Sequence, residues 1–271
     1  MRPKTAIILV RPDQAEHHQT TWGGAFAAGL KKHGWRVDLR RIAGPRSDLL
    51  DMWSTRKQRE IGIQRALGGQ VCILERGYVG DRFKWTSVSF NGGLNGHADF
   101  YGPFDDGSRW QQHFAHLMHP WQTRPSGYAL IMQQVPGDMS LEGADMPKFY
   151  GDAEGAYRPR MPIKVRPHPQ AHPRRPGTLE HAATSLAQDL AGAQLAVTWN
   201  SNSGVDAVLA GVPTIAANPG SMAWDVTGHK LGEVPPTPDR TAWAHALAWK
   251  QWRVDEMASG ACWEAVRHGV Q

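Results

Sequence analysis

The segment VTWNSNSGVDAVLAGVPTIAANPG, residues 197–220, decides the fold of this chain. An apolar strand over residues 195–198 leads into a turn of small hydroxyl and amide residues, and this turn opens a helix over residues 204–210. A Gly-Val-Pro turn then returns the chain to a second apolar strand over residues 213–217. Strand, turn, helix and strand in this order predict one βαβ unit of a parallel sheet.

The turn of this unit, Ser201, Asn202, Ser203 and Gly204, is a candidate ligand site. It would present backbone N–H groups at the positive end of a helix, which suits a phosphate or diphosphate, and Asp206 is placed to reach a ribose hydroxyl. Ser and Asn also cap helices without any ligand. A cap needs only one such residue, however, and open α/β sheets bind ligands at this edge, so we favour the ligand site.

The same alternation runs through the rest of the chain and predicts two Rossmann-like α/β lobes with parallel sheets and a cleft between them. We expect strands at residues 5–10, 35–39, 70–75, 128–132 and 162–166, and helices at residues 22–33, 48–67 and 179–191. Residues 76–125 lack periodicity and are expected to form loops, and residues 240–266 are expected to form two helices.

Charge and composition restrict the partners and the compartment. The formal charge of +5, a pI near 9.4 and twelve Trp favour polyanionic partners such as nucleotides, nucleic acid or anionic glycans. The apolar run at residues 6–10 is too short for a signal peptide or a membrane span, and Cys72 and Cys262 lack metal-ligand spacing. We expect a cytoplasmic protein without a metal site.

A second candidate site follows the strand that enters the sequence IKVRPHP, residues 163–169. Prolines on both sides of His168 restrict the backbone at the strand end. Arg166 can form a forked contact with a phosphate, and His168 can donate to its oxygens. A lone loop His is usually solvated, but the pairing with Arg166 favours donor binding.

A third candidate site is the segment QQVPGDMS, residues 133–140, which follows the strand at residues 128–132. It offers Gln133 and Ser140 for donor binding and Asp138 as a catalytic group. An ordinary Pro-Gly-Asp turn explains the same residues.

The first lobe carries a charged, glycine-containing segment, residues 75–82, after its expected third strand. Glu75 or Asp81 could act as the base that deprotonates an acceptor hydroxyl, although a solvated salt-bridged loop explains the charges equally well. Further polar and aromatic side chains are candidates for acceptor binding, namely Arg76, Tyr78, Arg82, Trp85, Asn95 and His97.

Three segments, Q-x-P-G-D-x-S at residues 134–140, R-P-H-P at 166–169 and S-N-S-G-V-D-A-V-L-A-G-V-P at 201–213, resemble the capsule polysaccharide biosynthesis transferases that move Kdo sugars. The C-terminal Ala- and Trp-rich segment is similar to the tail of that group. The resemblance implies a GT-B-like glycosyltransferase that uses a nucleotide-sugar (UDP-, GDP- or CMP-linked) as co-substrate. It also implies that Arg166, His168 and residues 201–203 face the donor. Asp206 stands where those enzymes tend to carry Glu.

The resemblance sets the expected domains and their roles. We expect an acceptor-side lobe at residues 1–125, a donor lobe at residues 126–239, and helices at residues 240–271 that pack across both. The first lobe instead resembles uncharacterised bacteriophage proteins in Glu-Arg-Gly-Tyr-x-Gly-Asp-Arg and Trp-Thr-Ser. A phage origin would make a hydroxymethylated pyrimidine in double-stranded DNA the expected acceptor.

Several functions stay open at this point. A metal-independent glycosyltransferase is the main expectation, because no convincing D-x-D metal motif is present. A capsule-type polysaccharide is the alternative acceptor. A non-catalytic nucleic-acid-binding protein on a degenerate GT-B scaffold and a nucleotide-sugar epimerase are the competing functions.

Overall fold

The computed structural model describes residues 2–44, 46–168 and 184–270. Pro169 of the R-P-H-P motif and residues 179–183 of the expected helix lie outside the described residues. No helix among those described is both long and apolar enough to cross a membrane.

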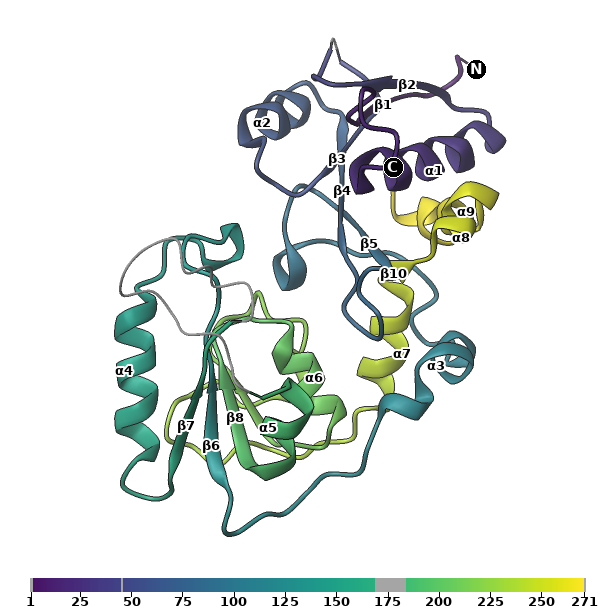
Figure 1. Cartoon of the computed structure of the whole chain (residues 1–271). Coiled ribbons are helices and arrows are strands. Elements are labelled where there is room, and N and C mark those ends of the chain that lie inside the picture. The colour runs from purple at the N-terminus through teal and green to yellow at the C-terminus, as the bar shows by residue number, and fades with distance from the viewer. Residues whose placement is uncertain (1, 45, 169–183, 271) are drawn as a thin grey trace. The chain divides into compact units, whose positions relative to one another are not determined.

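The chain folds as two compact units (Figure 1). Unit 1 combines residues 1–112 with residues 244–271, and unit 2 is residues 113–243. The chain therefore leaves unit 1, builds unit 2 and then returns. The sequence-based lobe boundaries at residues 125 and 239 stay a prediction.

Unit 1 is built on a mixed sheet with the strand order β10-β5-β4-β3-β1-β2 among the described residues. The first four strands in the chain run parallel, while β5 is antiparallel to β4 and β10 is antiparallel to β5. The strands are β1 (Thr5–Leu9), β2 (Arg36–Arg40), β3 (Leu49–Trp53), β4 (Gln70–Arg76), β5 (Thr86–Phe90) and β10 (Gln251–Trp252).

Helices cover both faces of this sheet, so its central strands are buried on two sides. One core joins the sheet to the first helix and to two helices of the returning segment, and a second core lies under a polar helix. These helices are α1 (His18–Lys32), α8 (Val254–Ser259) and α9 (Ala261–Val266) on one face and α2 (Gln58–Ala66) on the other. The two points at which the chain passes between the units, residues 112/113 and 243/244, fall within α3 (Ser108–His113) and α7 (Thr241–Trp249).

Unit 2 contains a parallel sheet in the order β7-β6-β8-β9. One helix packs on one face of the sheet, and two shorter helices pack on the other (Figure 1). The strands are β6 (Tyr128–Met132), β7 (Ile163–Arg166), β8 (Ala193–Thr198) and β9 (Thr214–Ala216), and the helices are α4 (Met146–Tyr157), then α5 (Leu186–Gly192) and α6 (Ser203–Leu209).

The helix expected over residues 48–67 is wrong, because its first part is the buried strand β3 and only residues 58–66 form α2. Asp51 made this stretch look polar, yet its side chain is buried in the middle of the sheet beside Cys72. Burial raises the pKa of Asp51 to about 7. Hydrogen bonds from the Cys72 thiol and the Met52 backbone N–H offset only part of this rise. A carboxyl whose pKa is raised this far is protonated over a much wider pH range than usual, so it can occupy a core position that its residue type argues against.

The loop expected over residues 76–125 is also only partly correct. It contains β5, in which all five residues are buried, and α3. Thr86, Ser87 and Ser89 make three of the five residues of β5 polar, which hides the strand from a hydrophobicity pattern. The two helices expected in residues 240–266 are instead α7, α8 and α9 with β10 between them, and α4 was not foreseen.

A buried arginine holds the returning segment in unit 1. The Arg109 guanidinium, on α3, is 6% exposed and forms two hydrogen bonds to the Glu256 carboxylate, at 2.6 and 2.7 Å. It also donates to the carbonyls of Ala248 and Gln251, both at 2.9 Å. Three indole rings surround it at 4.5–5.3 Å from the Cζ atom, those of Trp85, Trp249 and Trp252. Ion pairing, hydrogen bonds and cation–π contacts together compensate the buried charge.

The returning segment also contacts α1 closely. A Cβ placed on Gly29 would lie 2.1 Å from the Met257 carbonyl oxygen of α8, far inside van der Waals contact. Only glycine therefore allows this approach. Gly24, on the same helix, would meet no atom within 4 Å.

We expect Gly29→Ala to lower the free energy of unfolding by about 1–3 kcal/mol, the usual cost of overpacking a core. Gly24→Ala is the matched control and should leave stability unchanged or raise it by up to about 1 kcal/mol, because Ala favours helix. Urea denaturation followed by circular dichroism measures both. Equal effects of the two substitutions would contradict the close packing of α1 on α8.

Candidate functional site

The candidate site lies at the carboxyl edge of the unit 2 sheet. Since β6, β7, β8 and β9 run parallel, the segments that follow them meet at one edge. These segments are residues 133–140, 167–168, 199–204 and 217–221. The fold thus brings together the three motifs noted in the sequence and adds the segment after β9.

Buried amides connect these segments. The Gln134 side chain donates to Asn200 Oδ1 at 2.9 Å and accepts from the Asn200 backbone N–H at 3.0 Å. The Asn200 Nδ2 donates in turn to the Ser140 carbonyl at 2.6 Å and to Asn218 Oδ1 at 3.3 Å. The ends of β6, β8 and β9 are therefore fixed to one another by satisfied buried hydrogen bonds.

Gln134 and Asn200 are the residues that sequence reasoning missed. Gln133, which precedes Gln134, and Asn202, which is two residues after Asn200, were predicted instead. The Gln133 backbone N–H donates to the Arg166 carbonyl at 2.9 Å and so continues the pairing of β6 with β7. The signal that could have found them is the alternation of the strands: Gln134 and Asn200 are polar residues at positions where this alternation still predicts an inward-facing side chain.

The turn at residues 201–204 is internally bonded, which differs from the expected set of open N–H groups. The Ser201 N–H donates to Thr198 Oγ1 at 3.1 Å, and the Ser203 N–H donates to Ser201 Oγ at 3.3 Å. The Gly204 N–H donates to the Ser201 carbonyl at 2.9 Å. The half-buried Ser201 and Ser203 hydroxyls, 2.9 Å apart, are therefore what this turn offers to a ligand.

Asp138 and Ser140 form a compact polar turn at the same edge. The Asp138 carboxylate accepts from the Ser140 N–H at 2.9 Å and from its hydroxyl at 2.7 Å. Asp138 itself is exposed. The turn orients a carboxylate that solvent can reach.

Arg166 is largely committed within unit 2. Its Nη1 donates to the Thr184 carbonyl at 2.7 Å and to the carboxylate of Asp189, which is 1% exposed. Lys164 pairs with the other carboxylate oxygen at 2.6 Å. Burial alone would raise the pKa of Asp189, but hydrogen bonds from Lys164, Thr184 and Arg166 outweigh it and lower that pKa. His168 follows β7 and is half-buried.

A pocket of about 550 Å³ opens beside this edge, between α4 and the ends of β8 and β9. Within the described chain its lining does not include Arg166, His168 or Ser201. It does include aromatic, amide and charged side chains, among them Lys148, Phe149, Asp152, Trp199 and Asn218. The Trp199 ring packs edge-on against Phe149, with the ring centroids 5.2 Å apart.

In unit 1, two of the residues predicted to bind an acceptor lie in the core. Tyr78 is 3% and Trp85 is 8% exposed, and burial raises the pKa of Tyr78. The backbone N–H of Tyr78 donates to the buried Gln251 side chain at 2.6 Å. Both rings therefore serve packing, which corrects the expectation of an aromatic binding surface at these two positions.

The other predicted residues of unit 1 lie near its surface. Asp81 accepts from the Phe83 N–H at 3.0 Å and pairs with Lys84 at 3.7 Å, and Arg82 donates to the Gly77 carbonyl at 3.1 Å. Glu75 Oε1 accepts from the N–H of Arg76 at 2.9 Å. Asn95 and His97 lie in a short 3₁₀ turn.

The described part of the chain contains no cluster of metal-ligating side chains. No group of three or more His, Cys, Asp or Glu side chains there is arranged to hold a metal ion. Metal independence stays a prediction.

Solved structures with the same fold exist, although no protein-family model and no curated protein sequence matches this chain. The Thermosulfurimonas dismutans KpsC beta Kdo 2,4 transferase aligns with a TM-score of 0.63 over 93% of both chains, at 15% identity. The beta Kdo 2,7 transferase of the same organism's KpsC aligns with a TM-score of 0.58 over 93% of this chain and 92% of that one, at 14% identity. The expected α/β, GT-B-like fold is confirmed.

The Arg166–Asp189 pair generates a stability prediction. Arg166→Ala removes one partner of a buried carboxylate and should lower the free energy of unfolding by about 1–3 kcal/mol at pH 7. Because the folded-state pKa of Asp189 is depressed, this contribution is present above the unfolded-state value of about 3.9 and is lost as pH falls through the folded-state pKa.

Urea denaturation at pH 7 and pH 3 measures the effect. Arg158→Ala, which removes an exposed pair with Glu154, is the control and should cost less than about 0.5 kcal/mol. An Arg166→Ala penalty that does not shrink at pH 3 would show that Asp189 is not the group concerned.

Proposed function

We propose that this chain is a glycosyltransferase that moves a sugar from a nucleotide-sugar donor to a hydroxyl of a glycan. The observation that carries the proposal is the meeting of four polar strand ends beside a pocket of about 550 Å³, at the carboxyl edge of the unit 2 sheet. The GT-B-like fold supports it, since that edge is where open α/β sheets hold their ligands.

The donor is assigned to unit 2. The Ser201 and Ser203 hydroxyls and His168 would contact the diphosphate or phosphate, with Asn202, Gly204, Asp206 and Ser140 around them. The pocket lined by Trp199 and Asn218 has an aromatic wall and an amide, which suit a nucleoside. Arg166 takes part through its charge and by positioning, because one of its nitrogens already binds Asp189.

We propose Asp138, whose exposed carboxylate lies at this edge, as the catalytic carboxylate. Glu75 and Asp81 belong to unit 1 and are the alternatives.

The acceptor proposed is a polysaccharide of the capsule type, because the two KpsC structures with this fold are named as Kdo transferases. A hydroxymethylated pyrimidine in phage DNA would need the same donor site. The two acceptors are therefore separated by experiment.

The proposal predicts turnover of at least one nucleotide-sugar. UDP-, GDP- and CMP-linked sugars are incubated with the chain and an oligosaccharide mixture or hydroxymethylated duplex DNA, and products are identified by mass spectrometry. His168→Ala and the double variant Ser201→Ala/Ser203→Ala should each lower kcat/KM by about tenfold or more, since each removes hydrogen bonds to a charged group.

Arg158 is exposed and directly follows α4, so Arg158→Ala should leave kcat/KM unchanged. Isomerised donor without transfer would indicate an epimerase instead. No turnover of any donor, together with unchanged nucleotide binding in the His168 and serine variants, would end the proposal.

A further inference from the structure

The carboxyl edge of the unit 1 sheet carries a cluster of aromatic and basic side chains that sequence reasoning missed. Because β1, β3 and β4 run parallel, the residues at their ends share this edge. Trp53 ends β3, Arg76 ends β4, and His18 begins α1 just after β1. Of these three residues, only Arg76 was predicted as an acceptor contact. The adjacent histidines at positions 17 and 18, placed between a strand and a helix, were the available signal.

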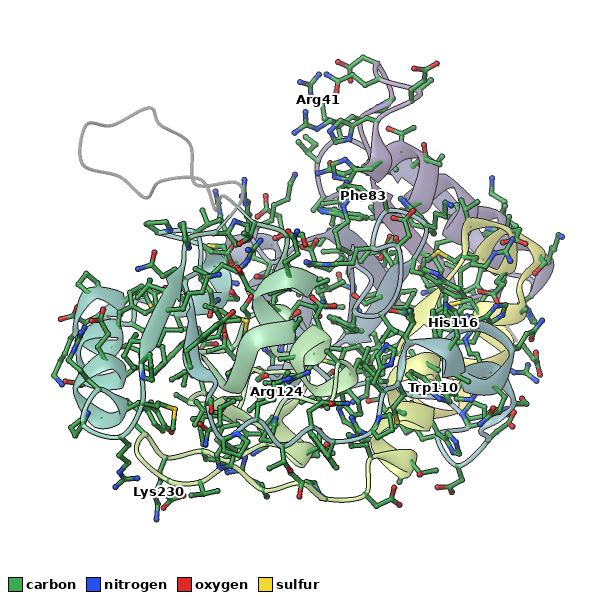
Figure 2. The ribbon with its side chains drawn as sticks, turned by 60° about the horizontal axis from the view of Figure 1, so that its bottom comes forward. Arg41, Phe83, Trp110, His116, Arg124 and Lys230 are labelled. Carbon is green, nitrogen blue, oxygen red and sulfur yellow. The ribbon has the colours of Figure 1, made fainter. Side chains whose placement is uncertain are left out.

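The side chains in this cluster contact one another through their rings and the Arg76 guanidinium. The His18 ring lies edge-on to Trp53 with the ring centroids 4.4 Å apart. The Arg76 guanidinium lies between two rings, with its Cζ 5.4 Å from the centre of Trp53 and 4.5 Å from that of Phe83. Phe83, labelled in Figure 2, is 69% exposed. An exposed ring stacked on an arginine leaves a flat, polarised surface that a ligand can contact.

The cluster is electropositive. Burial, followed by the charges of His17, Arg76 and Arg11, lowers the pKa of His18 to about 4. Arg82 adds a further positive charge near Arg76, and the Glu75 carboxylate partly offsets these charges. The Asp81 carboxylate accepts from the N–H of Phe83 at 3.0 Å. A neutral imidazole held among cations is the arrangement that an added anion stabilises in its protonated form.

The backbone at this edge is also unusual. Ser54, directly after Trp53, has a φ of 61°, in the left-handed region that a non-glycine residue occupies at a cost of roughly 1 kcal/mol or more. Its N–H donates to the Leu74 carbonyl at 3.0 Å, so β4 holds it in place. Such strain collects at ligand sites more often than elsewhere.

We propose that this edge of unit 1 binds an anionic sugar unit, with Arg76 and His18 contacting the acid group and Phe83 and Trp53 contacting the sugar ring. The identity of this unit as part of the acceptor glycan rests on the proposed function. Binding itself does not, because it requires neither donor nor turnover. The preference for acidic over neutral sugar is therefore a property of unit 1 that can be measured alone.

The test measures binding of tetragalacturonate, maltotetraose and a short DNA duplex to the full chain by titration calorimetry at fixed salt. We expect tetragalacturonate to bind about tenfold or more tightly than the neutral maltotetraose. Arg76→Gln should weaken tetragalacturonate binding about tenfold, and Phe83→Ala about fivefold. NMR titration should show the pKa of the His18 imidazole rising when tetragalacturonate is bound.

Arg65→Ala is the matched control for net charge, since this exposed residue ends α2 at the opposite edge of the same sheet, and it should leave binding unchanged. The exposed Phe83 makes its variant safe for folding, and circular dichroism confirms the folding of all three variants. Equal binding of the two oligosaccharides, or equal losses in Arg65→Ala and Arg76→Gln, would overturn the proposal. DNA binding that depends on Arg76, with no tetragalacturonate binding, would overturn it in favour of a nucleic-acid surface. Failure of sugar transfer with this binding intact would instead count against the proposed function.

Discussion

Unit 1 depends on the buried Arg109 guanidinium. Its charge is compensated by groups of residues 248–256, which include two indole rings, and by the ring of Trp85, which precedes β5. Because an uncompensated buried charge is costly, the returning segment and α3 must assemble together. Gln251 extends the same linkage, since its buried amide accepts from the N–H groups of Tyr78 and Val79 and donates to the Val79 carbonyl. Gln251, which is more than 170 positions further along the chain, thereby fixes the loop that follows Arg76 and β4.

In unit 2 the corresponding constraint is an amide network rather than a charge. Gln134, Asn200 and Asn218 fix three strand ends at hydrogen-bond distance, so the turns that carry Ser140 and Ser201 have little freedom. Preorganisation of this kind lowers the entropic cost of ligand binding. The hydroxyls and the Asp138 carboxylate then lie on a rigid edge, which favours the binding of a ligand in one orientation.

The sequence predicted the strands of unit 2 well, because β6, β8 and β9 are apolar runs bounded by turn residues. It failed where polarity and burial disagree. Asp51 hid β3, the Ser and Thr residues hid β5, and the inward-facing Gln134 and Asn200 were passed over for their neighbours. Tyr78 and Trp85 were assigned to a surface because their loop is rich in glycine and charge, whereas Tyr78 packs against Phe100 and the Arg109 guanidinium lies over Trp85. Each error comes from a contact with a residue distant in sequence, which local patterns do not contain.

The order in which the polypeptide is synthesised gives the interrupted layout of unit 1 a consequence of its own. Unit 2 is a continuous stretch, so all of it leaves the ribosome before residues 244–270 do. Until those residues emerge, α1 lacks α8 and α9, the Phe26 ring of α1 lacks its contact with Trp263, and Arg109 lacks its Glu256 counter-ion. Nascent unit 1 therefore exposes apolar surface during translation, while unit 2 can already be folded.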